Sequence, residues 1–231
     1  MVNNWLRRPW PCYCALCGGH AAGPLDLCDG CADELPWLLH PCMRCGVPLP
    51  APSAVPCGGC LQRPPRFQHC FSPLCYQSPA AELVAALKFH GNLSAGNLLG
   101  ELLAHHLREQ PAATMVEALV PIPLHWRRRW QRGFNQSEVL ADVVRRRLRL
   151  PVAHGLLRRS RHTTPQQQLD AAARARNLRQ AFTVPRAVAG RHLALIDDVA
   201  TTGATAEAAA DALLIAGAAS VQLWCVTRTP L

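Results

Sequence analysis

The stretch that decides the fold runs Leu193-Ala-Leu-Ile-Asp-Asp-Val-Ala-Thr-Thr-Gly-Ala-Thr205. Its first four residues are apolar, two acids follow, and a loop of small residues then opens a segment with helical periodicity. An apolar strand joined to a helix in this way is the unit from which parallel α/β sheets are built. Because such sheets bind ligands at the carboxyl ends of their strands, the sequence predicts an α/β fold with a ligand site at Asp197 and Asp198.

The loop that follows the two acids has the chemistry of an anion site. The backbone N–H groups and hydroxyls of Thr201–Thr205 stand at an expected helix N-terminus, where phosphate binds. The carboxylates of Asp197 and Asp198 can accept hydrogen bonds from vicinal hydroxyls or hold a divalent ion through water. A phosphate on one side and a diol on the other describe a ribose 5-phosphate. The alternative is an ordinary helix cap beside a solvated acid pair, which suits a lone Asp-Asp better than the full pattern. It is not a P-loop, because no Gly-Lys-Ser/Thr follows.

Apolar periodicity places further elements on both sides of this stretch. Strands are expected at Phe71–Gln77, Ala118–Ile122, Leu193–Ile196 and Ser220–Thr227. Helices are expected at Pro79–Phe89, Ala95–Glu109, Asn135–Leu148 and Thr205–Ala216, with Asn135 or Ser137 as the cap of the third. Strands that alternate with helices indicate a parallel sheet flanked by helices.

The cysteines form a second signal. Eight of the twelve make four Cys-x-x-Cys pairs, namely Cys14 with Cys17, Cys28 with Cys31, Cys42 with Cys45, and Cys57 with Cys60. The first 14 residues lack the apolar core of a secretory signal, so we expect a cytoplasmic protein whose cysteines hold metal rather than disulfides. Two such pairs complete a four-thiolate shell without an open position, which predicts two structural zinc ions. Redox pairs or an iron–sulfur cluster are the alternatives.

How the four pairs group around the metal stays open at this stage. Sequential ribbons are the simplest choice, although an interleaved arrangement fits the same spacing, and Cys12 competes with Cys14 as a ligand. Glycines stand where tight turns need a permissive backbone, at Gly18, Gly46 and Gly58–Gly59. The cysteines outside the pattern are expected to be ordinary thiols: Cys12, Cys70, Cys75 and Cys225.

A domain boundary falls soon after the last cysteine pair. The consecutive prolines of Gln62–Phe67 block both helix and central strand, which is typical of a linker. The segment before them is too poor in aliphatic residues to fold without metal. We therefore expect a double zinc-ribbon domain at 1–66 and an α/β domain at 67–231. The most apolar run, Ala212–Thr227, is too short to span a membrane and is broken by Gly217 and Ser220.

Positive charge is concentrated in one part of the chain. The 231 residues include 24 Lys and Arg against 15 Asp and Glu, a net charge of +9, and Lys88 is the single lysine. Between Arg127 and Arg191 there are 16 arginines and three acids. Such a block indicates a phosphate-rich partner, either nucleic acid or a nucleotide. A genome-wide bias toward arginine explains the choice of arginine over lysine but not this clustering.

The Leu193–Thr205 stretch resembles the phosphoribosyl-pyrophosphate (PRPP) signature of type I phosphoribosyltransferases, with no substitution at an expected contact. The resemblance implies that Asp197 and Asp198 contact the ribose hydroxyls. It implies phosphate contacts from the loop residues Thr201, Thr202, Gly203, Ala204 and Thr205. It also implies that Mg2+ bridges the pyrophosphate.

Three further stretches resemble the ComF family of competence proteins. They are Val120–Leu124 with Arg129–Gln136, then Gln166–Leu169 with Arg174–Asn177 and Ala181–Phe182, and finally Lys88–Gly91. With the cysteine pairs, the resemblance covers nearly the whole chain and is closest to the enterobacterial GntX-like branch of DNA-utilisation proteins. It implies a type I phosphoribosyltransferase-like fold behind a double zinc ribbon, and involvement in the uptake or use of external single-stranded DNA.

Basic residues around the expected site have candidate roles. The loop after the second strand should face the pyrophosphate, where Arg132 and the run Arg127–Arg129 offer charge-assisted hydrogen bonds. The segment Arg158–Arg179 resembles the flexible hood loop that closes over substrate and excludes water. Lys88 is either a phosphate contact or a surface cation, and for any single arginine the solvated surface is the competing interpretation.

Two classes of function fit these observations. In the first, the protein binds PRPP and single-stranded DNA and acts in DNA uptake, with the uptake machinery as a possible partner. In the second, it is an enzyme that transfers a phosphoribosyl group from PRPP to a base or another small acceptor, although no acceptor pocket can be predicted. Trp126 and Trp130 beside the arginines either stack on bases, which favours the first class, or are buried between the domains.

Overall fold

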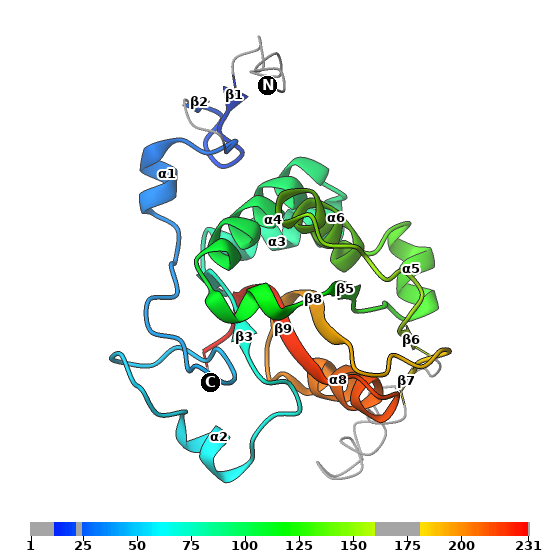
Figure 1. Ribbon diagram of the computed structural model, residues 1–231. Helices are drawn as coiled ribbons and strands as arrows, with labels where there is room; N and C mark the ends of the chain where they lie inside the picture. Colours follow the sequence, from blue (N-terminus) through cyan, green and yellow to red (C-terminus); the bar gives the residue numbers. More distant parts are fainter. Residues whose placement is uncertain (1–11, 22–24, 160–180, 231) are drawn as a thin grey trace, which may run out of the picture.

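The computed structural model describes residues 12–21, 25–159 and 181–230, and a parallel β-sheet lies at its centre (Figure 1). The strand order is β3 (Cys70–Phe71), β9 (Ser220–Arg228), β8 (His192–Ala200) and β5 (Ala118–Pro121), with β4 (Leu74–Cys75) also paired to β9. Each of these pairings is parallel. The predicted α/β fold is confirmed.

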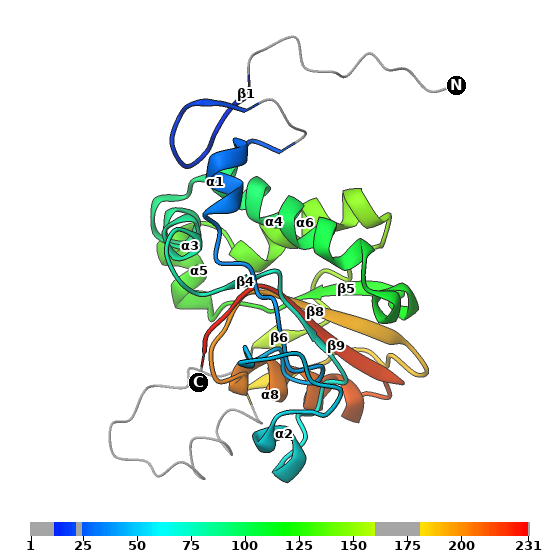
Figure 2. The same cartoon turned by 90° about the vertical axis from the view of Figure 1, so that its left-hand side faces the viewer.

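Helices cover both faces of the sheet, as Figures 1 and 2 show. One face carries α3 (Ala80–His90), α4 (Leu93–Arg108) and α6 (Gln136–Leu148), and the other carries α8 (Ala204–Ile215). Each of these corresponds to a helix that the apolar periodicity predicts. Among the described residues, no helix combines the length and the apolar composition that crossing a membrane requires.

The packing of these layers follows from residue size. In α4, a Cβ on Gly100 would lie 2.6 Å from the Cβ of Val143 in α6, so only glycine lets the two helices approach this closely. Leucines fill the rest of this layer, and the indole of Trp224 from β9 is fully buried against it. On the opposite face, α8 presents alanines to the sheet, so that helix also lies close to the strands.

The strand that carries the acid pair is longer than the apolar run predicts. We expected Leu193–Ile196, but β8 continues to Ala200, so both acids lie inside the strand rather than after it. The reason is the neighbouring strand: β9 pairs with β8 as far as Ala200, with Cys225 opposite Asp197 and Arg228 opposite Ala200. The ladder therefore carries two acids to the carboxyl edge of the sheet.

The predicted single strand at 71–77 is instead two short ones. β3 and β4 both pair with β9, and Pro73 separates them. Because proline has no N–H to donate to a ladder, it interrupts the pairing at this edge of the sheet. The remaining short elements are β1 (Cys12–Tyr13), β2 (His20–Ala21), α1 (Asp29–Asp33), α2 (Gly58–Gln62), η2 (Pro111–Met115), α5 (Trp126–Arg132), β6 (Arg158–Arg159) and β7 (Phe182–Thr183).

The cysteine-rich part of the chain forms two units, the first around Cys14–Cys31 and the second around Cys42–Cys60. They pack against different parts of the α/β core. Cys14, Leu27 and Leu35 of the first unit belong to the same buried cluster as α3 and α4. The second unit has its own small cluster of Cys42, Val47 and Cys60, and α2 lies near α8 (Figure 2). The chain between them runs beside β4, where Leu38 N donates to Pro73 O at 2.9 Å. The sheet thus lies between the two units.

Candidate functional site

The acid pair occupies the carboxyl edge of β8. Asp198 shares a sheet face with Ala194 and Ile196, and it is 3% exposed. The Nζ of Lys88, near the end of α3, lies 3.1 Å from Asp198 Oδ2. A buried carboxylate needs such a partner, because removing it from water is costly. Lys88 is therefore not a freely exposed surface cation: it belongs to the same group of side chains as the acid pair.

Asp197 has a different environment from its neighbour. Its Oδ1 accepts hydrogen bonds from the Ser137 hydroxyl at 3.2 Å and from the backbone N–H of Asp198 at 2.9 Å. Burial and the adjacent Asp198 carboxylate raise the pKa of Asp197 to about 7, against the opposing effect of these donors and of Lys88. Near neutral pH, Asp197 therefore exchanges a proton easily, as expected for two acids held side by side.

The motif Gly133-Phe-Asn-Gln-Ser137 connects the loop after β5 to this pair. Asn135 caps α6 by accepting from Ser137 N at 3.1 Å, and its Nδ2 donates to Ile122 O at 3.1 Å. Of the two predicted caps, Asn135 is the one used. Ser137 instead contacts Asp197, a role that the sequence analysis missed because serine near a helix start is explained by capping alone.

Arg132 lies on the same side of the molecule as Lys88. Its Nη1 donates to Gln136 Oε1 at 3.3 Å, and its guanidinium carbon lies 5.2 Å from the centre of the Phe89 ring. Phe89 follows Lys88 in α3. The structure therefore brings Arg132 close to the helix end that supplies the lysine.

The threonine-rich loop begins where β8 ends. Gly203 has a φ of +77°, which an L side chain rarely adopts, and it forms the cap residue of α8. Thr201 and Thr202 are exposed, and Thr202 Oγ1 accepts from Ala204 N at 3.4 Å. The loop thus presents hydroxyls and the N-terminus of a 12-residue helix at the edge where the acid pair lies. This arrangement can bind a phosphate group.

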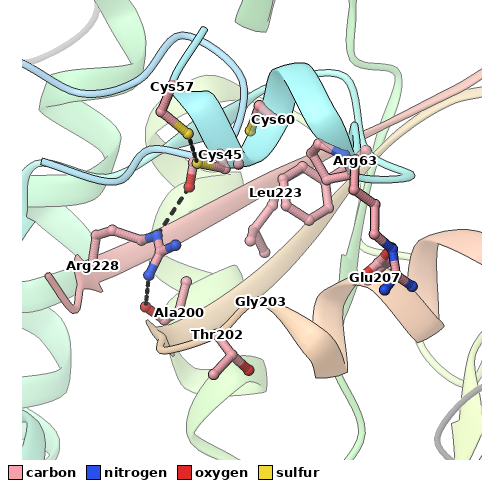
Figure 3. Close-up of a pocket in the computed structure, with 13 residues that line it drawn as sticks. Cys45, Cys57, Cys60, Arg63, Ala200, Thr202, Gly203, Glu207, Leu223 and Arg228 are labelled. Carbon is pink, nitrogen blue, oxygen red and sulfur yellow. Dashed lines mark hydrogen bonds between the residues drawn. The ribbon is translucent and has the colours of Figure 1, made fainter. Parts of the chain in front are cut away.

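A cavity of about 190 Å³ lies between this loop and the second cysteine-rich unit (Figure 3). On one side the cavity is lined by the loop residues Ala200, Thr202 and Gly203, together with Glu207 of α8. On the other side it is lined by Arg63 and by three cysteines of the second tetrad, Cys45, Cys57 and Cys60. The remaining lining residues are Gly59, Pro65, Phe67, Leu223 and Arg228. The sequence analysis did not predict this contact between the two parts of the chain.

The eight paired cysteines form two tetrads. The first is Cys14, Cys17, Cys28 and Cys31, and the second is Cys42, Cys45, Cys57 and Cys60, with sulfurs within 4.8 Å of one another in each. The grouping is therefore sequential. The sulfurs of Cys17 and Cys28, and of Cys45 and Cys57, lie 3.7 Å apart. Four thiolates about 2.3 Å from a tetrahedral zinc are separated by roughly 3.8 Å, so the geometry fits structural zinc and is far from a disulfide.

The tight turns favour the thiolate form of the first cysteine in each tetrad, whereas burial and neighbouring cysteines raise the pKa of Cys31, Cys45 and Cys60. Gly18 and Gly46 have φ of +72° and +70°, as the turns require, whereas Gly58 and Gly59 open α2 without such a conformation. Burial opposes ionisation of the first cysteine in each tetrad, but backbone N–H donors outweigh it. They lower the pKa of Cys14 to about 6 and that of Cys42 to about 7. Thiolate is the form that binds zinc.

Some predicted features lie outside the described residues. They include the greater part of the expected hood segment, 160–179, with the motif from Gln166 to Asn177, and the side chains of Cys12, Arg127 and Arg128. β6, at the start of the hood segment, and β7, which follows it, form an antiparallel pair. Trp126 and Trp130 are described, and they are 62% and 88% exposed, which rules out burial between the domains.

The molecule is thus an α/β protein with a parallel sheet, a charged site at one strand edge and a double zinc ribbon at its N-terminal side. The double zinc ribbon family matches residues 5–61. DNA utilization protein YhgH of Escherichia coli K12 is 37% identical over 223 residues, covering 95% of this chain and 96% of that protein. Competence protein F of Haemophilus influenzae is 31% identical over 208 residues, covering 87% and 90%. Competence protein ComFC of Bacillus subtilis is 29% identical over 214 residues, covering 88% and 84%. The chain belongs to the ComF family of competence and DNA-utilization proteins.

Proposed function

We propose that this protein binds Mg2+-PRPP and single-stranded DNA and acts in the uptake or use of external DNA, as the names of its relatives suggest for them. The observation that carries the PRPP part is the position of Asp197 and Asp198 beside the loop Thr201–Thr205, at one edge of the sheet. A diol-binding group and a phosphate-binding group lie side by side there. PRPP contains both a ribose diol and a 5-phosphate, which are the ligands that these two groups would bind.

Each group of side chains has a proposed role. Asp197 and Asp198 accept hydrogen bonds from the ribose hydroxyls, and Thr201, Thr202, Gly203, Ala204 and Thr205 hold the 5-phosphate. Arg132 and Lys88 supply positive charge for the pyrophosphate. The carboxylate oxygens of the acid pair and the phosphate oxygens of the ligand are the hard donors that Mg2+ prefers, so the residues present fit this ion. When bound, it would neutralise the charge of the pyrophosphate.

Calorimetry with Mg2+-PRPP tests this assignment. The double variant Asp197→Asn, Asp198→Asn keeps the shape of the pair and removes its charge. Because a hydrogen bond to a charged group contributes about 1.5–3 kcal/mol, we expect a loss of about tenfold or more for each residue. Equal affinity of wild type and double variant would refute the assignment. The circular dichroism spectra of both proteins serve as the control for folding.

The DNA part of the proposal is supported by an exposed aromatic and basic surface. It consists of Phe89 at the end of α3 and Trp126 and Trp130 of α5, which are 68%, 62% and 88% exposed. Arg132 stacks over Phe89 at this surface, and Arg129 lies on the same short helix. Exposed rings beside arginines are what single-stranded nucleic acid needs for stacking and phosphate contact.

A salt series tests the DNA part. Affinity for a labelled single strand should fall with salt, with a slope of about −0.7 in log affinity against log salt for each phosphate neutralised. Neutralising Arg127, Arg128 and Arg129 should flatten this slope and leave zinc content unchanged. The series is run with and without Mg2+-PRPP. Absence of binding even at low salt would remove DNA from the proposal.

An active phosphoribosyltransferase is the second candidate, because the PRPP signature is complete in this sequence. This enzyme would consume PRPP when a free base or another small acceptor is supplied. Measuring pyrophosphate release with a panel of acceptors decides between the candidates. Turnover with a free base, together with no binding of single strands, would favour the enzyme over the DNA-handling protein.

A further inference from the structure

One buried arginine joins the second cysteine tetrad to the threonine-rich loop. Arg228, the last residue of β9, is 2% exposed, and its guanidinium donates to backbone carbonyls of both parts. Its Nε donates to Cys45 O at 2.9 Å, and its Nη1 donates to Ala200 O at 2.9 Å (Figure 3). The same Nη1 also donates to the carbonyls of Thr201 and Thr229.

The burial of Arg228 gives this bridge a fixed geometry. Arginine is seldom fully buried unless its charge is compensated, and within the described part of the chain the guanidinium of Arg228 donates to carbonyl oxygens of fixed direction. The cavity of about 190 Å³ lies between the second tetrad and the residues Thr202 and Gly203, and Arg228 is one of the residues that line it. Arg228 therefore links the start of the loop to the carbonyl of Cys45.

From this arrangement we infer that metal at the second tetrad positions the phosphate loop through Arg228, and that zinc and PRPP binding are consequently coupled. Cys45 is a ligand of that tetrad, so the metal fixes the carbonyl that Arg228 contacts. Ala200 and Thr201 are the residues at which the loop leaves β8. The first tetrad packs against the layer of α3 and α4 instead, so it should not take part. The identity of the ligand rests on the proposed function, whereas the bridge does not.

Matched cysteine variants of the full-length protein test the coupling. Cys57→Ser removes a ligand of the second tetrad, and Cys28→Ser removes the corresponding third ligand of the first. Each variant should bind one zinc ion fewer. We expect Mg2+-PRPP affinity, measured by calorimetry, to fall by at least about tenfold in Cys57→Ser and to stay within about twofold of wild type in Cys28→Ser. Equal affinity of the two variants would overturn the inference.

The Arg228→Lys variant separates the bridge from the metal. Lysine keeps the charge but lacks the planar fork that reaches Cys45 and Ala200 together. We expect this variant to keep both zinc ions and its circular dichroism spectrum, and to bind PRPP at least about tenfold more weakly than wild type. Wild-type affinity in this variant would show that the bridge does not position the loop.

Hydrogen exchange distinguishes failure of the coupling from failure of the proposed ligand. Amide exchange over residues 199–205, measured without any ligand, should be faster in Cys57→Ser and Arg228→Lys than in wild type, and unchanged in Cys28→Ser. If wild-type protein does not bind PRPP but this pattern appears, the proposed function fails and the bridge stands. If exchange is the same in all four proteins, the inference is wrong whatever the ligand.

Discussion

The ammonium of Lys88 lies 3.1 Å from the carboxylate of Asp198, and the two side chains are 19% and 4% exposed. The single lysine of the chain thus compensates the more buried of two adjacent acids. This pair explains how β8 tolerates Asp198 beside the apolar layer formed by α3 and α6. It also ties the end of α3 to the edge of the sheet where the proposed ligand binds.

Removing one partner of this ion pair should be more harmful than removing both charges. We expect Lys88→Met to lower the free energy of unfolding by about 3 kcal/mol, the lower end of the range for broken buried pairs, because Lys88 is partly exposed. The double variant Lys88→Met, Asp198→Asn should recover a large part of that loss. Urea denaturation of the wild type, both single variants and the double variant gives the coupling energy. Strictly additive effects would show that the pair contributes nothing.

Purified protein should contain two zinc ions per chain. Elemental analysis measures this directly, and a count near zero in protein prepared under reducing conditions would contradict the assignment of the tetrads. Chelation should melt residues 12–62 and leave the α/β part largely folded, because structural zinc supplies about 10–16 kcal/mol in small zinc peptides. Limited proteolysis after chelation should therefore cut first within the cysteine-rich segment.

The raised pKa of Asp197 predicts how stability depends on pH. An unfolded aspartate loses its proton near pH 4, whereas Asp197 in the folded protein has a pKa of about 7. Between these values the folded state binds more protons, so this residue makes stability fall as the pH rises from about 4 to about 7. Above about pH 7 its destabilising effect is fully present.

The variant Asp197→Asn isolates this effect, because an amide oxygen can still accept from Ser137. We expect the variant to be more stable than wild type at about pH 8, by about 1–3 kcal/mol, since a pKa unit corresponds to about 1.4 kcal/mol and Asp197 keeps some contact with solvent. At about pH 4 the two proteins should differ little. Urea denaturation over this pH range provides the measurement, and a constant difference between the proteins would contradict the shifted pKa.

The sequence predicts the elements of the fold well because each depends on local pattern. The four main helices and the central strands follow from apolar periodicity, and the tetrads follow from spacing. The predicted end of β8 is wrong, because the position of that end depends on pairing with β9 and not on the polarity of Asp197. A strand end is set by its neighbour wherever that neighbour continues.

The connections between distant residues could not be predicted in the same way. Arg228 gives a weak signal, a charged residue at the end of a strand that is otherwise uncharged, but nothing in the sequence indicates that it contacts Cys45. Lys88 was ambiguous for the same reason, since a lysine at a helix end has many possible partners. Such contacts depend on how the layers pack, and no periodicity records that.

The more exposed of the two tryptophans of α5 gives a prediction for DNA binding that charge alone does not make. Trp130 is 88% exposed, so replacing it by alanine should not disturb the core. If a base stacks on it, Trp130→Ala should weaken single-strand binding by about 1–3 kcal/mol, or roughly 5- to 150-fold. The salt slope should stay unchanged, because no phosphate contact is lost. Tyr13, which is 63% exposed in the first cysteine-rich unit, provides a matched control as Tyr13→Ala. Fluorescence anisotropy of a labelled oligothymidine over several salt concentrations measures both quantities. If Trp130→Ala and Tyr13→Ala bind equally well, stacking of a base on Trp130 is excluded.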